Sequence, residues 1–269
     1  MRRGEVKHGS AWALVTGAGS GIGRSYALRL AALGYRLALV GNRPEPLETV
    51  KTELLAAGCA EVYLTLCDLA RAEAAEELHA ATTAAGIEPH VVINNAGMFS
   101  FCDILATPPE RIERMILLHA MTNTKLCRLY AEDMVRGGIR GHLLNMASYS
   151  QWMPFPGLAL YSASKAYLHQ FSVCFAKEMR EHGIRVTVVC PAGVATDLYG
   201  LPPRWQRIGL RLGALISADK CARRGLHALW CGRRTCVPDW WNRIGIPICK
   251  ILPLWLLAPI RKYTMKFQK

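Results

Sequence analysis

The chain has 269 residues, of which 51% are apolar, and its formal net charge is +13. The length suffices for one large domain with a well-buried core, and the apolar content excludes a disordered chain. From residue 200 onward there are fourteen Lys and Arg but only two acidic residues, together with five of the seven Trp. A basic segment that is also apolar and aromatic suits a membrane surface better than nucleic acid.

The charged N-terminal stretch has no apolar run before the first predicted strand, so we expect no secretory signal and a cytoplasmic location. The ten cysteines are scattered and form no Cys-x-x-Cys pair. We therefore expect reduced, mostly buried thiols and no metal site.

A buried strand is predicted over 11–16, and a glycine-rich loop and a helix that ends at Gly34 follow it. Glycines at this place let the backbone approach phosphate groups, which the N-terminus of the next helix attracts. A purely structural turn is the alternative, since a glycine-rich turn alone is weak evidence. The predicted phosphate-binding residues are Gly17, Gly19, Ser20, Gly21, Ile22 and Gly23.

The second predicted strand, 35–40, is followed by Gly41, Asn42 and Arg43, with no acidic residue before Glu45. An acidic residue here would bind the ribose 2′-hydroxyl of NAD, whereas an arginine can pair with the 2′-phosphate of NADP. We predict that Asn42 and Arg43 bind the cofactor and that NADP(H) is favoured over NAD(H). A hydrated loop charge is the alternative for Arg43.

Strands and helices continue to alternate along the chain. Helices are predicted over 46–58, 71–86, 161–182 and 218–230, and strands over 61–67, 90–93, 141–147, 185–190 and 233–237. This alternation predicts right-handed βαβ units. We expect an α/β, three-layer Rossmann-like fold, in which a doubly wound parallel sheet of about seven strands is covered by helices on both faces, with all of 1–269 in one domain.

Tyr161 and Lys165 are four residues apart, so a helix places both side chains on one face. An ammonium beside a phenol favours the phenolate, and we expect Lys165 to lower the pKa of Tyr161. Such a phenol can exchange a proton with a substrate oxygen, which Ser148 at the end of the fifth strand would hold. The alternative is an exposed pair on a helix.

These motifs together resemble the short-chain dehydrogenase/reductase family over residues 11–197. The resemblance is carried by Thr16-Gly17-x-x-x-Gly21-Ile22-Gly23, Asp68, Asn94-Asn95-Ala96-Gly97, Ser148, Tyr161 and Lys165. It implies that Ser148, Tyr161 and Lys165 are catalytic and that Lys165 also bonds the nicotinamide ribose. It further implies cofactor contacts at Asp68, Leu69, Asn95, Ala96 and Gly97, and at the turn residues Pro191, Val194 and Thr196.

One position departs from the family pattern. The family commonly has a catalytic Asn on the helix before the Ser148 strand, and this chain has His119 there. In the family, this Asn holds a helix distortion whose carbonyl binds a water that links the lysine to solvent. His119 could replace the side-chain bond or join the proton path, so we include it among the catalytic candidates. A packed helix histidine is the alternative.

The family resemblance weakens after residue 197. An amphipathic basic helix is predicted over 201–216, within the segment 198–218 where the family places its substrate lid. The segment 238–269 is a basic, apolar extension. Its stretch 244–260 contains three prolines and is too short to span a bilayer, so we expect it to lie in a membrane interface or to cover the cleft or a dimer face.

The sequence thus predicts an NADP(H)-dependent oxidoreductase that reduces a ketone, or catalyses the reverse reaction. The apolar, aromatic stretch after Ser148 predicts a hydrophobic substrate, such as a steroid, long-chain acyl or sphingoid ketone, as in the relatives it loosely resembles. The resemblance also implies a homodimer through the helix over 161–182 and the helix before it. The alternative is a non-catalytic, cofactor-binding regulatory or scaffold protein, against which the complete set Ser148, Tyr161 and Lys165 argues.

Overall fold

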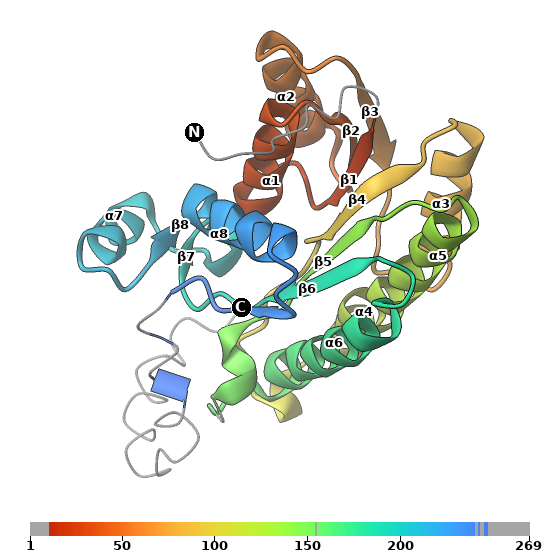
Figure 1. Ribbon diagram of the computed structural model, residues 1–269. Coiled ribbons are helices and arrows are strands. Elements are labelled where there is room, and N and C mark those ends of the chain that lie inside the picture. Colours follow the sequence, from red (N-terminus) through yellow and green to blue (C-terminus); the bar gives the residue numbers. More distant parts are fainter. Residues whose placement is uncertain (1–10, 154, 240–241, 243–244, 247–269) are drawn as a thin grey trace.

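In the computed structural model, seven parallel strands form one sheet, and helices cover both of its faces (Figure 1). The structure describes residues 11–153, 155–239, 242 and 245–246, so most of the segment 238–269 lies outside the described residues. The strand order β3-β2-β1-β4-β5-β6-β9 confirms the predicted α/β, Rossmann-like fold. The strands are β1 (Trp12–Thr16), β2 (Arg36–Gly41), β3 (Val62–Leu66), β4 (Pro89–Asn94), β5 (His142–Met146), β6 (Arg185–Val189) and β9 (Thr235–Cys236).

Two hydrophobic cores hold the helices against the sheet. Because side chains alternate along a strand, Ala13 and Val15 of β1 face one core, and Trp12 and Leu14 face the other. The first core receives α1 (Gly21–Ala32), α2 (Pro44–Ala56) and α8 (Ala218–Trp230). The second receives α3 (Ala74–Ala84), α5 (Asn123–Arg136) and α6 (Ala159–Glu178), and α4 (Pro109–Ile116) contacts α6.

The strand order reverses at β1, which pairs with β2 on one side and with β4 on the other. In doubly wound sheets, the loops that leave the carboxyl ends of the strands separate at this point and open a crevice where ligands bind. Here these loops are the glycine-rich loop after β1 and the segment 95–103 after β4. The fold therefore places the predicted phosphate-binding and Asn94-to-Gly97 motifs at one edge of the sheet.

The region after residue 197 differs from the prediction. Instead of one helix over 201–216, the chain forms α7 (Pro203–Arg211) and then a two-residue strand, β8 (Ile216–Ser217), which pairs in parallel with β7 (Val194–Ala195). The helix ends early because Gly213 has a φ of +74°, which breaks the helical path. The apolar spacing alone did not show this break.

Four short elements complete the described chain. Three are 3₁₀ turns, at Ile104–Ala106, Tyr149–Trp152 and Asp197–Tyr199, and the fourth is a π-helix at Leu117–Thr122, between α4 and α5. Where the predicted helices and strands form, their ends lie within a few residues of the prediction. Within the described residues, none of the helices combines the length and the apolar character that crossing a bilayer requires.

Candidate active site

A cleft of about 370 Å³ opens at the carboxyl edge of the sheet, where the strand order reverses. It brings together residues from eight separate segments of the sequence. Of the predicted site residues, it is lined by Gly17, Gly19, Ser20, Gly21, Ile22, Asn42, Arg43, Asp68, Leu69, Asn95, Ala96, Gly97, Ser148, Tyr161, Lys165, Pro191, Val194 and Thr196. Only Gly23 and His119 lie outside the lining, and each contacts a residue that belongs to it.

The glycine-rich loop has the backbone shape of a phosphate cradle. Gly17 and Gly21 have positive φ angles, +63° and +53°, which other residues rarely adopt. A Cβ at Gly23 would lie 2.1 Å from the Gly17 carbonyl oxygen, so the start of α1 packs directly on the loop. The loop thus leaves room for phosphate oxygens at the N-terminus of α1, where backbone N–H groups and the helix dipole favour an anion.

The Asn94-to-Gly97 motif fixes this loop from the neighbouring strand. The Asn95 side-chain amide donates to the carbonyl oxygens of Thr16, at 3.0 Å, and Gly17, at 3.2 Å. In return, the Thr16 hydroxyl accepts hydrogen bonds from the backbone N–H groups of Asn95 and Ala96. The motif therefore sets the position of the phosphate cradle relative to β4.

Asp68 lies after β3 with both carboxylate oxygens engaged. One accepts a hydrogen bond from the Ala70 N–H at 3.1 Å, and the other accepts one from Arg114 at 2.9 Å. Burial opposes ionisation of Asp68, but these two hydrogen bonds outweigh it and lower the pKa of the carboxyl. Arg114 was not predicted, because 46 residues separate it from Asp68 and only the fold brings them together.

Arg43 lies at the N-cap of α2, exposed at the rim of the cleft. Among the described residues it has no ion-pair partner, whereas the nearby Arg24 pairs with Glu53 and Arg36 pairs with Glu61. A guanidinium without an internal counter-charge beside a phosphate cradle can receive a further phosphate.

Ser148 and Tyr161 meet at the inner end of the cleft. Both side chains are buried and they share a hydrogen bond. Burial raises the pKa of Tyr161 to about 12, and the bond with Ser148 offsets this only in part. This direction is opposite to the predicted lowering by Lys165, because a buried phenolate loses its hydration.

The burial of Lys165 explains why this residue does not lower the pKa of Tyr161. Its Nζ is buried and donates to the Met146 carbonyl oxygen at 2.9 Å. Burial lowers the pKa of Lys165 to about 7, so its ammonium form is itself destabilised. Its Nζ lies 5.9 Å from the centre of the Tyr161 ring, so the two groups remain neighbours on one face of α6, as their spacing predicted.

His119 is fully buried in the π-helix, and both of its ring nitrogens are hydrogen-bonded. Nε2 accepts from the backbone N–H of Met98 at 3.1 Å, so the ring proton must be on Nδ1, which donates to the Ser164 hydroxyl at 2.9 Å. Ser164 in turn donates to the carbonyl oxygen of Tyr161. Burial, and then the charge of Lys165, lower the pKa of His119 well below its usual value. This neutral ring favours a side-chain bonding role over a place in the proton path.

The helix distortion that the family resemblance implies is present around His119. Leu118 and His119 lie in the π-helix, and the Asn123 side-chain amide donates to the Leu118 carbonyl at 2.7 Å and to the His119 carbonyl at 3.4 Å. Sequence reasoning did not single out Asn123. No sequence motif marks Asn123, because its role depends on the irregular helix in which it lies, one turn after its two carbonyl partners.

Aromatic rings lie next to Tyr161, on residues that do not themselves line the cleft. The Phe99 ring packs edge-on to Tyr161 with centroids 5.0 Å apart, and Phe101 lies 6.0 Å from Phe155 in the loop after Ser148. Further lining residues that sequence reasoning did not single out are Gly41, Pro46, Leu47, Cys67, Met98, Leu118, Met146, Ala147, Asp197 and Leu198. Most follow the carboxyl end of a strand, which is the only signal that could have found them.

The sequence model of the family described as short chain dehydrogenase matches residues 11–205. The chain belongs to this family. The match covers the sheet through β6, the glycine loop, the Ser148, Tyr161 and Lys165 group and the turn over 191–196. It confirms the family that the motifs predicted.

Curated relatives of this short-chain dehydrogenase match between about two thirds and three quarters of its length. The very-long-chain 3-oxoacyl-CoA reductase of Bos taurus is 32% identical over 201 residues, which are 73% of this chain and 64% of the relative. The probable oxidoreductase EphD of Mycobacterium tuberculosis is 32% identical over 184 residues, 68% of this chain and 31% of the relative. The chain thus spans less than two thirds of the length of these relatives.

Solved structures share the fold over most of the chain. A short-chain dehydrogenase from Sphingobium yanoikuyae in complex with NADPH superposes with a TM-score of 0.76 at 27% identity and covers 95% of both chains. A metagenomic short-chain oxidoreductase in complex with NADP gives a TM-score of 0.68 at 29% identity, covering 82% of this chain and 90% of the other. A 7beta-hydroxysteroid dehydrogenase, at 24% identity and a TM-score of 0.80, shows the fold alone.

Proposed function

We propose that the chain is an NADP(H)-dependent oxidoreductase that reduces a ketone on a hydrophobic substrate, or oxidises the corresponding alcohol. The observation that carries this proposal is the convergence of Ser148, Tyr161 and Lys165 in a cleft that also contains the glycine cradle. The chain fits a dinucleotide, since Gly17 and Gly21 have positive φ angles and a Cβ at Gly23 would close the cradle. Gly17, Gly19, Ser20 and Gly21 would hold its phosphates, and Val194 and Thr196 its nicotinamide end.

A bound nicotinamide supplies or accepts the hydride, and the side chains handle the proton. The raised pKa of Tyr161 keeps it protonated at neutral pH, which suits a proton donor, and the alkoxide formed from a ketone is more basic than a phenolate. Ser148 shares a hydrogen bond with Tyr161 and holds the substrate oxygen beside it. Lys165, when protonated, stabilises the phenolate that remains.

For His119 we propose a positioning role. It ties the Met98 backbone to Ser164, and through Ser164 to the backbone of Tyr161. These bonds fix the segment after β4 against the first turns of α6. His119 thereby sets the distance between the wall of the cleft and the proton donor.

The preference for NADP(H) rests on Arg43, which lines the cleft and has no acidic partner among the described residues. We expect Arg43→Ala to raise the KM for NADPH by about 10-fold or more and to leave the KM for NADH nearly unchanged, because only NADPH has the 2′-phosphate. Steady-state kinetics with both cofactors measures this. The exposed Arg140→Ala, at the opposite edge of the sheet, is the control. Equal changes for both cofactors in Arg43→Ala would contradict the assignment.

The proposal of a hydrophobic substrate rests on the ring of Phe99, which packs on Tyr161, and on the neighbouring rings of Phe101 and Phe155. Burying apolar surface contributes about 25 cal/mol per Å², so each such ring favours a long or bulky apolar ketone over a small polar one. The 3-oxoacyl-CoA reductases among the relatives support the long-chain acyl class. A panel of steroid, long-chain 3-oxoacyl and sphingoid ketones, assayed by NADPH oxidation, tests the substrate class.

Tyr161→Phe tests the reaction type. Removing the phenol oxygen removes the proton donor, so we expect turnover to fall by about 10²–10⁴-fold. NADPH binding should persist, because Lys165 is held by Met146 and not by Tyr161. Tyr130→Phe is a matched control, since Tyr130 is equally buried and hydrogen-bonded to Thr82 but lies on α5, outside the cleft lining. Full turnover in Tyr161→Phe would refute the mechanism.

We also propose a homodimer through α5 and α6. Exposed apolar side chains on these helices, Val135 and Tyr167, support it, as does the stacking of Tyr167 on Phe171. Light scattering after gel filtration measures the mass in solution, and a monomer would contradict the proposed homodimer.

The predicted membrane contact of the segment 238–269 concerns residues that are mostly outside the described ones. Sedimentation of the full chain and of one ending at Asp239 with membranes tests that contact.

A further inference from the structure

The helix α7 stands out from the body of the molecule next to the short β7–β8 pair (Figure 1). None of its residues is buried. It packs on the rest of the chain through Gly209, where an added Cβ would lie 2.7 Å from the Leu215 side chain, and the Leu215 N–H donates to the Gly209 carbonyl at 3.0 Å. Because glycine has no side chain, this contact does not bury the larger side chains of α7.

The apolar side chains of this segment are exposed. Trp205 is 59% exposed and Leu212 is 78% exposed, although amphipathic surface helices of globular proteins normally turn such residues toward the core. Trp205 lies in α7 and Leu212 is its C-cap residue seven positions later, so the two follow one side of the helix. Gly209 lies on the same side and packs on Leu215, but Trp205 and Leu212 themselves stay exposed among the described residues and are available to a partner.

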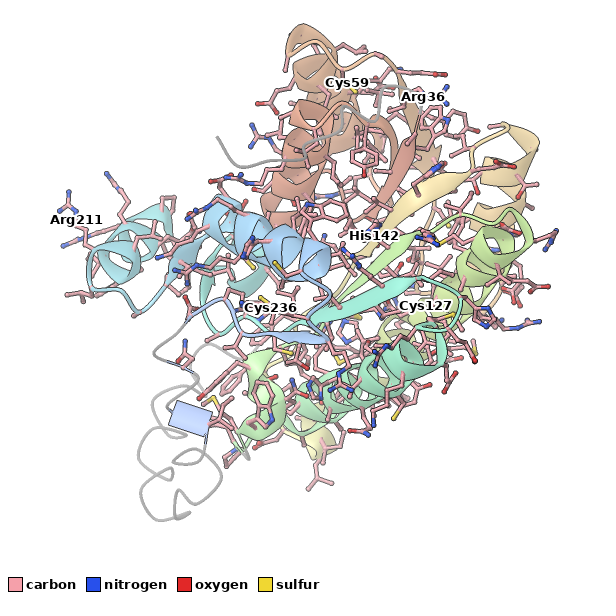
Figure 2. The ribbon with its side chains drawn as sticks, in the orientation of Figure 1. Arg36, Cys59, Cys127, His142, Arg211 and Cys236 are labelled. Atoms are coloured by element: carbon pink, nitrogen blue, oxygen red, sulfur yellow. The ribbon has the colours of Figure 1, made fainter. Side chains whose placement is uncertain are left out.

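An arginine stripe runs beside the apolar face. Arg204, Arg207 and Arg211 are spaced by three and four residues, and all three are exposed. Figure 2 shows Arg211 extending outward from the end of α7. Asp219 already pairs with Arg29 at 2.7 Å, and Asp239 interacts with Arg224 and Lys220. Among the described residues, no ion pair involves Arg204, Arg207 or Arg211, so the charge of this stripe is not neutralised there.

We propose that α7 and the turn at Leu212 form a docking face for an anionic lipid bilayer. Tryptophan and leucine side chains enter the boundary between headgroups and acyl chains, and arginines pair with lipid phosphates at the level above them. The combination favours lipid over nucleic acid, because apolar side chains this exposed add nothing to phosphate binding in water. The proposal does not depend on the oxidoreductase activity. Leu198 lines the cleft and precedes α7, so the docked face adjoins the cleft.

The test compares vesicles of phosphatidylcholine alone with vesicles that also contain phosphatidylserine, using the full-length chain in a sedimentation assay. We expect binding to the mixed vesicles only, reduced by salt. The variant Arg204→Gln/Arg207→Gln/Arg211→Gln should bind about 100-fold more weakly, at about 5-fold for each arginine. The pair Trp205→Ser/Leu212→Ser should also weaken binding, through lost insertion.

The matched control is Arg140→Gln/Arg233→Gln/Arg234→Gln, which removes the same charge from exposed positions preceding β5 and β9, at the opposite edge of the sheet. It retains the same C-terminal segment, so the difference between the two triple variants reports α7 alone. Equal binding by these variants, or no binding by the unmodified chain, would overturn the proposal. A change of oligomeric mass in Trp205→Ser/Leu212→Ser without any vesicle binding would also overturn it, in favour of a second copy on this face.

Discussion

Replacing Lys165 with methionine is expected to make the folded chain more stable at neutral pH while it abolishes turnover. Methionine fills a similar volume without a charge, whereas the ammonium of Lys165 is buried with one hydrogen bond, to Met146. Its pKa falls from 10.5 in the unfolded chain to about 7 in the folded one. Between these two values the unfolded chain binds more protons than the folded chain, so the unfolding free energy contributed by Lys165 rises with pH.

The size of the effect follows from this interval. Because the unfolded chain binds the Lys165 proton more tightly than the folded chain, Lys165 lowers the unfolding free energy by about 4 kcal/mol at pH 7 and by about 2 kcal/mol at pH 9. This loss vanishes above pH 10.5. Losing the hydrogen bond to Met146 subtracts about 1 kcal/mol from the gain. We therefore expect Lys165→Met to gain about 3 kcal/mol at pH 7 and about 1 kcal/mol at pH 9.

Urea unfolding of both chains at several pH values between 6.5 and 9 measures this difference. Taking the difference cancels the buried thiol of Cys127, whose raised pKa acts in the opposite direction as the unfolded thiol ionises. The thiol of Cys190 interacts with the charge of Lys165, so its contribution does not cancel, and it is smallest at the lower pH values, where the unfolded thiol stays protonated. The control Lys177→Met removes an exposed lysine of the same helix and should change the unfolding free energy by less than about 0.5 kcal/mol. A gain for Lys165→Met that is the same at pH 7 and pH 9 would refute the reasoning.

Two further predictions concern residues that support the cleft. Gly23→Ala should weaken NADPH binding by more than about 10-fold, measured by fluorescence titration, because its Cβ would lie 2.1 Å from the Gly17 carbonyl oxygen. In the control Gly86→Ala, the φ of +67° strains the backbone, but the Cβ would meet no atom within 4 Å, so we expect lower stability with NADPH binding retained. Equal losses of binding in the two variants would contradict the cradle. His119→Leu should lower the unfolding free energy by about 1–3 kcal/mol and also lower kcat, because the Met98 N–H loses its acceptor. His119→Asn should restore an acceptor in part. If the Leu and Asn variants have the same unfolding free energy and kcat, His119 acts by simple packing.

The sequence contained enough local information to predict the parallel α/β fold and the set of residues around the cleft. The glycine loop and the Asn94-to-Gly97 motif are short patterns whose backbone demands are visible in the residue types themselves. The helix over 218–230 was predicted with its observed bounds for the same reason, since its apolar spacing is regular and Ser217 caps it.

The rest depended on contacts between distant segments. The pKa of Tyr161 was predicted in the wrong direction because spacing shows which groups are neighbours but not how deeply they are buried. The pairing of Asp68 with Arg114, and the bond of Lys165 to the Met146 carbonyl, join elements that only the fold brings together. The β7–β8 pair was missed because each strand has two residues, too few to give a period.

The place of β1 in the middle of the sheet bears on the order in which the chain can assemble. β1 is the first strand described, yet its second neighbour, β4, ends only at Asn94, and the strand that delivers Ser148 ends at Met146. A growing chain that has formed only β1 to β3 therefore exposes one edge of β1, a strand whose five residues are all buried in the folded chain. Pairing at this range closes long loops, which slows folding and favours association with other chains. During synthesis, the cofactor half of the cleft would await the complete catalytic set, which ends with Lys165, for about seventy more residues beyond β4, and a chaperone would be most needed in this interval.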